Sequence, residues 1–299
     1  MHVFVTGATG FIGSAIVQEL LSHGHRVTGL ARSDAAVEAL AAAGAAAHRG
    51  SIDDLDSLRR GAAEADAVIH TAFNHDFSRF AASCEADRGI VTALGDALAG
   101  SDRRLVVTSG TALVAGGPLA TETDTPSAHH PRVASEQAAA ALVERGVHAS
   151  VVRLPPSVHD VGDHGFVPLL VNLARQKGLA AYVGEGRNRW PAVHRLDAAE
   201  LFRRVAEQGR AGVSYHGSAE TGVPFAEITA VIGRRLGVPV QGLTGEAAAA
   251  HFGWFERFAG LDNLCSSDWT QHELGWNPRR TGLLADIDQP AYFPSGVAS

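Results

Sequence analysis

The stretch Thr6-Gly7-Ala8-Thr9-Gly10-Phe11-Ile12-Gly13 decides the fold of this chain, because it joins a strand-like apolar run to a helix-like one. Gly7 allows a turn with positive φ, Gly10 lets the backbone approach a pyrophosphate, and Gly13 lets the helix pack on the strand. The helix N-terminus also presents free N–H groups and the positive end of its dipole. The stretch therefore predicts a dinucleotide-binding loop. Its expected cofactor contacts are Gly7, Thr9, Gly10, Phe11, Ile12 and Gly13.

The alternation that begins here continues through about 155 residues. Strand-like runs lie at 2–7, 26–32, 46–50, 67–73, 103–110 and 148–155, and helix-like runs lie at 11–24, 34–44, 54–65, 77–99 and 129–142. Such alternation predicts an α/β fold with a parallel sheet covered by helices on both faces. The rhythm loosens after residue 160, and no linker or repeat separates the halves. The second half is therefore expected to fold as a lobe onto the first.

Composition narrows the function classes. The chain has 299 residues, 45% of them hydrophobic, and a net charge of −7 without a basic stripe, so nucleic acid is not an expected partner. The two cysteines, Cys84 and Cys265, have no metal spacing, and the fifteen histidines include no HExxH motif, so no metal site is expected. The strand-like run starts at residue 2, which leaves no room for a signal peptide, and no apolar run is long enough for a membrane helix. A reducing cytoplasm is the expected location.

The end of the second strand-like run favours NADP over NAD. An NAD site commonly places an acidic residue there to accept a hydrogen bond from the ribose 2′-hydroxyl. This chain has Arg32, whose guanidinium suits a 2′-phosphate, followed by Ser33 as a second donor. The alternative is a solvated arginine at a strand end. NADP(H) is therefore the expected cofactor.

Several segments, taken with the glycine-rich stretch, resemble the extended and atypical short-chain dehydrogenase/reductases, the group that contains the NAD-dependent epimerase/dehydratases. The resemblance implies a Rossmann-type, doubly wound sheet with a small C-terminal substrate-binding lobe. It places the cofactor domain at 1–160, completed by elements from about 190–215, and the lobe mainly at 161–299. It also implies cofactor contacts at Ser51, where aspartate is usual, and at Ile52, Thr71, Ala72 and Pro155. The matching segments are Gly50–Ile52, Ile69–Ala72, Val107–Ala112, Val152–Pro156, His194–Ala199 and Leu274–Pro278.

The catalytic residues of that family are missing. The family uses a serine or threonine together with a Y-x-x-x-K motif on a helix. The resemblance puts Gly110 at the serine, Arg132 at the tyrosine and Glu136 at the lysine. No Y-x-x-x-K occurs in the chain, whose only lysine is Lys177.

Arg132 and Glu136 are nevertheless candidates for the chemistry. An arginine does not readily donate its proton, but it stabilises an oxyanion or holds a carboxylate. The Glu136 carboxylate is suited to accept from ribose hydroxyls. The two residues are four apart and share a helix face, and the resemblance implies that this face is directed toward the nicotinamide. The alternative is an ordinary i,i+4 ion pair on a solvated face.

Neighbouring residues complete the predicted site. His129 and His130 titrate near neutrality and are candidate proton donors, against the alternative of two loop histidines. Ser109 and Thr111 flank the vacant serine position and offer hydroxyls to a substrate oxygen. The stretch around Tyr182 and Trp190 either covers the substrate or forms an exposed hairpin. The expected substrate contacts are Phe73, His129, His164, Tyr182 and Trp190.

These features together predict an NADP(H)-dependent oxidoreductase that interconverts a carbonyl and a secondary alcohol on a small or medium-sized, partly apolar molecule. Two alternatives remain open. One is a non-redox enzyme of epimerase or dehydratase type with a tightly held cofactor, and the other is a non-catalytic NADP-sensing protein. A small molecule is the expected partner, and a homodimer is compatible with the sequence.

Overall fold

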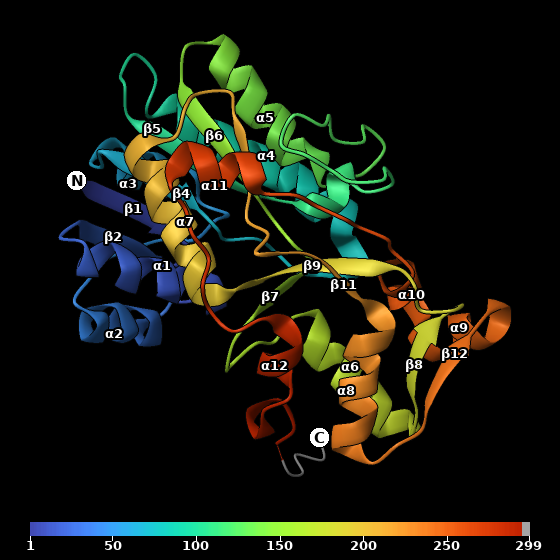
Figure 1. Ribbon diagram of the computed structural model, residues 1–299. Coiled ribbons are helices and arrows are strands. Elements are labelled where there is room, and N and C mark those ends of the chain that lie inside the picture. The colour runs from blue at the N-terminus through green and yellow to red at the C-terminus, as the bar shows by residue number, and fades with distance from the viewer. Residues whose placement is uncertain (295–299) are drawn as a thin grey trace.

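A seven-stranded parallel sheet lies at the centre of the computed structural model, which describes residues 1–294 (Figure 1). Its strand order is β10-β6-β5-β4-β1-β2-β3, and each neighbouring pair runs parallel. The order reverses at β1, so the carboxyl ends of β1 and β4 flank the crevice in which doubly wound folds bind ligands. The predicted fold class is confirmed. The strands are β1 (His2–Thr6), β2 (Arg26–Ala31), β3 (Ala46–Arg49), β4 (Ala67–His70), β5 (Arg104–Gly110), β6 (His148–Leu154) and β10 (Ser214–His216).

Helices cover both faces of this sheet. Val3 and Val5 point into the core shared with one helical layer, whereas Phe4 between them points into the core of the other. This alternation is the two-residue period of a strand that is buried on both sides. The first layer contains α1 (Phe11–Ser22), α2 (Asp34–Ala43) and α7 (Arg195–Gln208), and the second contains α3 (Leu55–Ala63), α4 (Phe80–Asp96) and α5 (Val133–Glu144).

Two α-helices begin later than the sequence predicted. The segment that was expected to be helical from His129 forms turns, and α5 starts at Val133. Pro131 explains the delay, because proline has no N–H and disfavours helical backbone in the residue before it. The segment from Phe77 begins as the 3₁₀ turn η1 (Phe77–Arg79) before α4.

The carboxyl-terminal segment forms a lobe with its own core, seen at the lower right of Figure 1. Trp190, Phe225 and Phe255 lie in this core without exposed surface. Its parallel strand pair and its helices are α6 (Phe166–Lys177), β8 (Ala180–Val183), α8 (Phe225–Leu236), β12 (Val240–Leu243), α9 (Gly245–Phe252), η3 (Gly253–Phe255), α10 (Glu256–Ala259), α12 (Leu283–Ile287) and η4 (Pro290–Tyr292).

A three-stranded sheet connects the two parts. Its order is β11-β9-β7, with β7 (Ser157–His159), β9 (Arg189–His194) and β11 (Glu220–Pro224). β7 follows β6 of the central sheet, and β9 leads directly into α7. The chain returns through α11 (Asp268–Leu274), which packs on α7. Among the described helices, none combines the length and apolarity that a membrane span requires.

Candidate active site

The glycine-rich loop between β1 and α1 has the packing of a phosphate loop. Gly7 has a φ of 69°, and a Cβ there would lie 2.7 Å from Thr71 Oγ1. A Cβ on Gly13 would lie 1.9 Å from the Gly7 carbonyl oxygen, so both positions require glycine. Gly10, by contrast, is exposed, and its Cβ would meet only that same oxygen, at 3.2 Å. No side chain caps α1, so its first N–H groups are free for an anion.

The predicted adenosine-side residues follow β2 and β3. Arg32 is exposed at the end of β2 and has no ion-pair partner within residues 1–294. Ser33 caps α2 by accepting a backbone hydrogen bond, which leaves its hydroxyl hydrogen free. Ser51 donates to the Asp53 carboxylate at 3.1 Å, and Ile52 packs against the core of the sheet.

The predicted nicotinamide-side residues lie against the same loop. The Thr71 hydroxyl donates to the Thr6 carbonyl at 2.7 Å, and the Ala72 N–H donates to the Thr6 hydroxyl at 3.3 Å. These bonds join the end of β4 to the end of β1. Pro155 is buried directly after β6. The ends of β1 and β4 are therefore held together at the edge of the sheet where the cofactor is predicted to bind.

Arg132 precedes α5 and is held by several partners. Its Nη1 donates to the Asp87 carboxylate at 2.7 Å and to the Ser135 hydroxyl, and its Nη2 donates to the Thr108 carbonyl at 2.9 Å. Its guanidinium carbon lies 4.2 Å from the centre of the Phe73 ring. Only 14% of the side chain is exposed. Arg132 is therefore a fixed group and not a solvated one.

Asp87 is the centre of a buried polar network that continues to the phosphate-loop strand. Its other oxygen lies 3.0 Å from His70 Nε2, and His70 Nδ1 lies 2.7 Å from the Thr6 hydroxyl. Burial by itself raises the pKa of Asp87, but His70, Arg132 and the Ser135 hydroxyl outweigh it and hold that pKa well below its usual range. Asp87 is therefore ionised and links α4 to β1, β4 and the start of α5.

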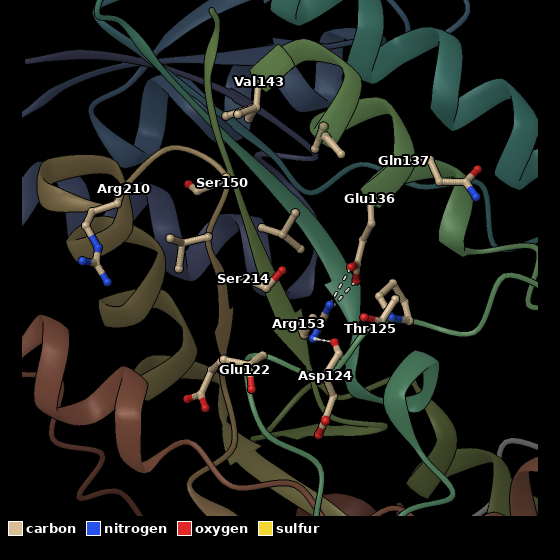
Figure 2. Close-up of a pocket in the computed structure, with 18 of the residues that line it drawn as sticks. Glu122, Asp124, Thr125, Glu136, Gln137, Val143, Ser150, Arg153, Arg210 and Ser214 are labelled. Atoms are coloured by element: carbon tan, nitrogen blue, oxygen red, sulfur yellow. Dashed lines mark hydrogen bonds and ion pairs between the residues drawn. The ribbon is translucent and has the colours of Figure 1, made fainter.

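Glu136 points in another direction, toward β6 (Figure 2). Its carboxylate accepts from Arg153 Nε at 3.0 Å, from Arg153 Nη2 at 2.8 Å and from the Ser109 hydroxyl at 2.6 Å. Arg153 also donates to the Asp124 carbonyl at 3.1 Å. Arg132 and Glu136 therefore each have a different partner, and the i,i+4 ion pair does not form between them. Neither side chain points into bulk water.

The hydroxyls beside the vacant serine position are both engaged. Gly110 ends β5, Ser109 donates to Glu136, and the fully buried Thr111 donates to the Asn263 side chain at 2.7 Å. Each hydroxyl oxygen keeps a lone pair, but its hydrogen has a protein acceptor. A substrate oxygen would therefore have to displace one of these bonds to accept from either residue.

The two histidines before α5 differ. His129 is exposed, whereas His130 is half-buried, and its Nδ1 accepts from the Arg132 N–H at 3.2 Å. Burial, followed by the charges of Arg257 and Arg132, lowers the pKa of His130. Its neutral ring therefore carries the hydrogen on Nε2 at neutral pH.

The remaining predicted substrate contacts lie at four different places. Phe73 lies under Arg132, and His164 meets the Phe11 ring edge-on with centroids 5.7 Å apart. Tyr182 is half-buried in β8. Trp190 has no exposed surface and packs on Phe225 inside the lobe, so it does not form the surface of a substrate mouth.

A groove of about 760 Å³ runs beside α5, and its described lining does not include the phosphate loop. Glu136 and Arg153 form its floor at one end, and Arg210 lies at the other (Figure 2). None of its described lining residues belongs to the phosphate loop or to the segment after β4. The groove is therefore separate from the predicted cofactor crevice.

The residues that hold Arg132 and Glu136 were not predicted from the sequence. His70 and Arg153 lie in segments that resemble the family, but neither was among the predicted site residues. Asp87 lay inside a long helical run, where an acidic residue is unremarkable. Only the meeting of α4, α5 and β6 in space reveals these contacts.

A second polar cluster joins the two parts of the chain near Phe11. One ligand atom each of Asp160, His194 and Asp286 lies within 4.8 Å of the others. His194 Nδ1 accepts from a backbone N–H at 3.2 Å, so its neutral ring presents a donor, and not a metal-binding lone pair, toward Asp160. Arg195 neutralises Asp160 at 3.0 Å and stacks over Phe11.

Known proteins resemble this chain along most of its length. An uncharacterized protein of Schizosaccharomyces pombe is 47% identical over 295 residues, which is 98% of this chain and 100% of that protein. A 4-hydroxy-2-methyl-3-oxo-4-farnesyl-3,4-dihydroquinoline-1-oxide ketoreductase of Stigmatella aurantiaca is 28% identical over 227 residues, covering 72% of this chain and 67% of the ketoreductase.

The fold matches a crystal structure of DesIV, a dTDP-glucose 4,6-dehydratase from Streptomyces venezuelae with NAD and TYD bound. The TM-score is 0.78 at 21% identity, covering 97% of this chain and 96% of that one. The profile of one protein family matches residues 3–217, which include the phosphate loop and all seven strands of the central sheet apart from His2, the first residue of β1. The chain therefore belongs to the NAD dependent epimerase/dehydratase family.

Proposed function

We propose that this protein is an NADP(H)-dependent oxidoreductase that interconverts a carbonyl and a secondary alcohol on a small or medium-sized organic substrate. The observation that carries the proposal is the similarity to a ketoreductase across 227 residues. The phosphate loop supports it, because Gly7 and Gly13 pack as such a loop requires while Gly10 leaves its outer surface open. A dinucleotide therefore fits the residues present.

The preference for NADP rests on the end of β2. The exposed Arg32 has no carboxylate partner within residues 1–294, and the nearby Asp34 is engaged by Arg49 at 2.6 Å. A 2′-phosphate would give Arg32 the anion that it lacks, and Ser33 has a hydroxyl hydrogen to donate. An NAD ribose would offer this arginine no charge.

Bound NADPH would supply a hydride to the carbonyl carbon, and the chain must then stabilise the oxygen and deliver a proton to it. Arg132 keeps two N–H donors, Nε–H and one on Nη2, without a partner among the described residues. We assign these donors to the developing alkoxide. His130 Nε2–H, on the same turn, is proposed to donate a hydrogen bond to that oxygen, which takes its proton from solvent at this position.

Glu136 has a narrower role than a free carboxylate would have. Three protein hydrogen bonds occupy most of its acceptor sites, which number about four in a carboxylate. The carboxylate lies in the groove beside α5, apart from the cofactor crevice, so we propose that it positions Ser109 and does not bind the nicotinamide ribose. Ser109 would then be positioned through Glu136, and Thr111 through Asn263.

A panel of aldehydes and ketones tests the proposal by the loss of NADPH absorbance at 340 nm. The proposal predicts stoichiometric oxidation of NADPH and formation of the alcohol. A non-redox enzyme of epimerase or dehydratase type would consume no NADPH overall. A sensor would bind NADPH and convert nothing, and either result would overturn the assignment.

A further inference from the structure

A continuous row of aromatic rings leads from the predicted catalytic residues to the surface. It starts at Phe73, which lies 4.2 Å below the Arg132 guanidinium. The ring centroids of Phe73 and Phe80 are 6.2 Å apart, those of Phe80 and Phe77 are 5.7 Å apart, and those of Phe77 and Trp254 are 4.7 Å apart. We call this row, together with the flanking Phe166 and Phe258, the aromatic wall.

The aromatic wall is built by both parts of the chain. Phe73, Phe77 and Phe80 follow β4 of the central sheet, whereas Phe166 begins α6 and Trp254 and Phe258 lie in η3 and α10 of the lobe. Phe77 lies 6.1 Å from both Phe166 and Phe258. The wall therefore lies where the lobe meets the carboxyl ends of the strands, the position at which this fold class binds ligands.

The rings of the wall are more open to solvent than those of a core. Trp254 is 53% exposed, and the five phenylalanines are half-buried. Phe255 and Trp190 lie directly behind them with no exposed surface, so the lobe has a filled core that does not include the wall. Exposed apolar surface of this kind marks a binding site more often than a scattered single residue does.

Polar donors stand at the inner end of this row, and the His75 ring lies beside Phe73 and Phe77, with centroids 5.2 and 6.3 Å away. Arg132 lies over Phe73, and His130 meets the Phe80 ring with centroids 6.0 Å apart. Aromatic faces bind other aromatic rings by offset or edge-on stacking, which a saturated ring of the same size does not reproduce. A ligand with a planar ring at one end and a carbonyl oxygen at the other would match both features.

We propose that the aromatic wall binds a planar aromatic ring of the substrate and directs its carbonyl toward Arg132 and His130. The substrate class is therefore an aryl ketone or aryl aldehyde. The carbonyl chemistry rests on the proposed function, but binding of the ring does not depend on turnover.

Calorimetric titration of the protein with 2-acetonaphthone and with its fully saturated decalin analogue tests the wall without any reaction. The aryl ketone should bind at least about tenfold more tightly, a factor in the range of one or two aromatic contacts. Trp254→Ala and Phe77→Ala should each remove most of that preference. Phe77→Leu keeps an apolar side chain if the alanine variant fails to fold. Trp269→Ala is the matched control, because Trp269 is also exposed, at 37%, but stacks on Tyr215 outside the wall.

Equal affinity for the two ketones would overturn the proposal that the aromatic wall binds an aryl ring. An equal loss of the aryl preference in Trp269→Ala and Trp254→Ala would overturn it as well. NADPH oxidation confined to aliphatic carbonyls, with no aryl preference, would also overturn it while leaving the proposed function intact. Tight binding of the aryl ketone without any NADPH oxidation would support the aromatic wall as a binding site and overturn the redox assignment.

Discussion

Asp87→Asn should destabilise the fold, because it removes the negative charge that neutralises Arg132 while Arg132 and the other buried partners of Asp87 stay in place. Asp87 is 1% exposed and holds Arg132 at 2.7 Å and His70 at 3.0 Å. Removing one member of a buried ion pair costs about 3–5 kcal/mol. Because 14% of the Arg132 side chain is exposed, the lower end, about 3 kcal/mol at pH 7, is expected. The measurement is urea unfolding of both proteins.

The pH dependence gives this prediction a second test. The pKa of Asp87 is lowered in the folded protein, so its carboxylate stabilises the fold above the unfolded value of about 3.9, and the stabilisation is lost as the pH falls below it. Asn does not titrate, so the difference between the two proteins should be about 1 kcal/mol smaller at pH 3 than at pH 7.

Asp96→Asn is the control, since Asp96 lies on the same helix and holds Arg145 at the same 2.7 Å, but in an exposed pair. It should cost less than about 1 kcal/mol. Equal losses in the two variants, or a loss for Asp87→Asn that does not change between pH 7 and pH 3, would refute the description of Asp87 as the ionised centre of the network.

Three further changes test the cofactor and the chemistry. Arg32→Ala should weaken NADPH binding by about 1.5–3 kcal/mol and leave NADH nearly unchanged, and a parent protein that binds both equally would contradict the NADP preference. Gly10→Val should abolish NADPH binding while the protein still folds, since a Cβ there meets only one protein atom; normal binding in calorimetry would show that the loop has another role. Arg132→Ala should reduce turnover about 10²-fold with NADPH affinity retained. Arg132→Lys should not restore the rate, because the point charge of an ammonium lacks the planar, forked donors of a guanidinium. An unchanged rate in Arg132→Ala would assign the chemistry to His130.

Most of the fold could be predicted from the sequence because the patterns that indicate strands, helices and turns are local. Apolar runs predicted the strands, and apolar residues at helical spacing predicted the helices between them. Gly7 and Gly13 have, respectively, the positive φ and the close packing that were expected of them. The later start of α5 is also a local effect, since Pro131 stands where the helix was expected to begin.

The surroundings of the site were harder to predict because its partners are distant in sequence. Helix periodicity placed Arg132 and Glu136 on one face, but their directions depend on Asp87, 45 residues before Arg132, and on Arg153, 17 residues after Glu136. The burial of Trp190 could not be predicted for the same reason, because the polar residues around it in sequence do not indicate which distant rings will cover it. The aromatic wall needed both parts of the chain to be assembled.

Transfer of deuterium from NADPH labelled at C4 tests the central claim most directly. The protein is incubated with each of the two C4-deuterated epimers of NADPH and 2-acetonaphthone, and the alcohol is analysed by mass spectrometry. A carbonyl reductase should transfer one deuterium to the carbinol carbon from one epimer and none from the other. Saturated binding of NADPH with no alcohol formed, or alcohol without deuterium from either epimer, would contradict it.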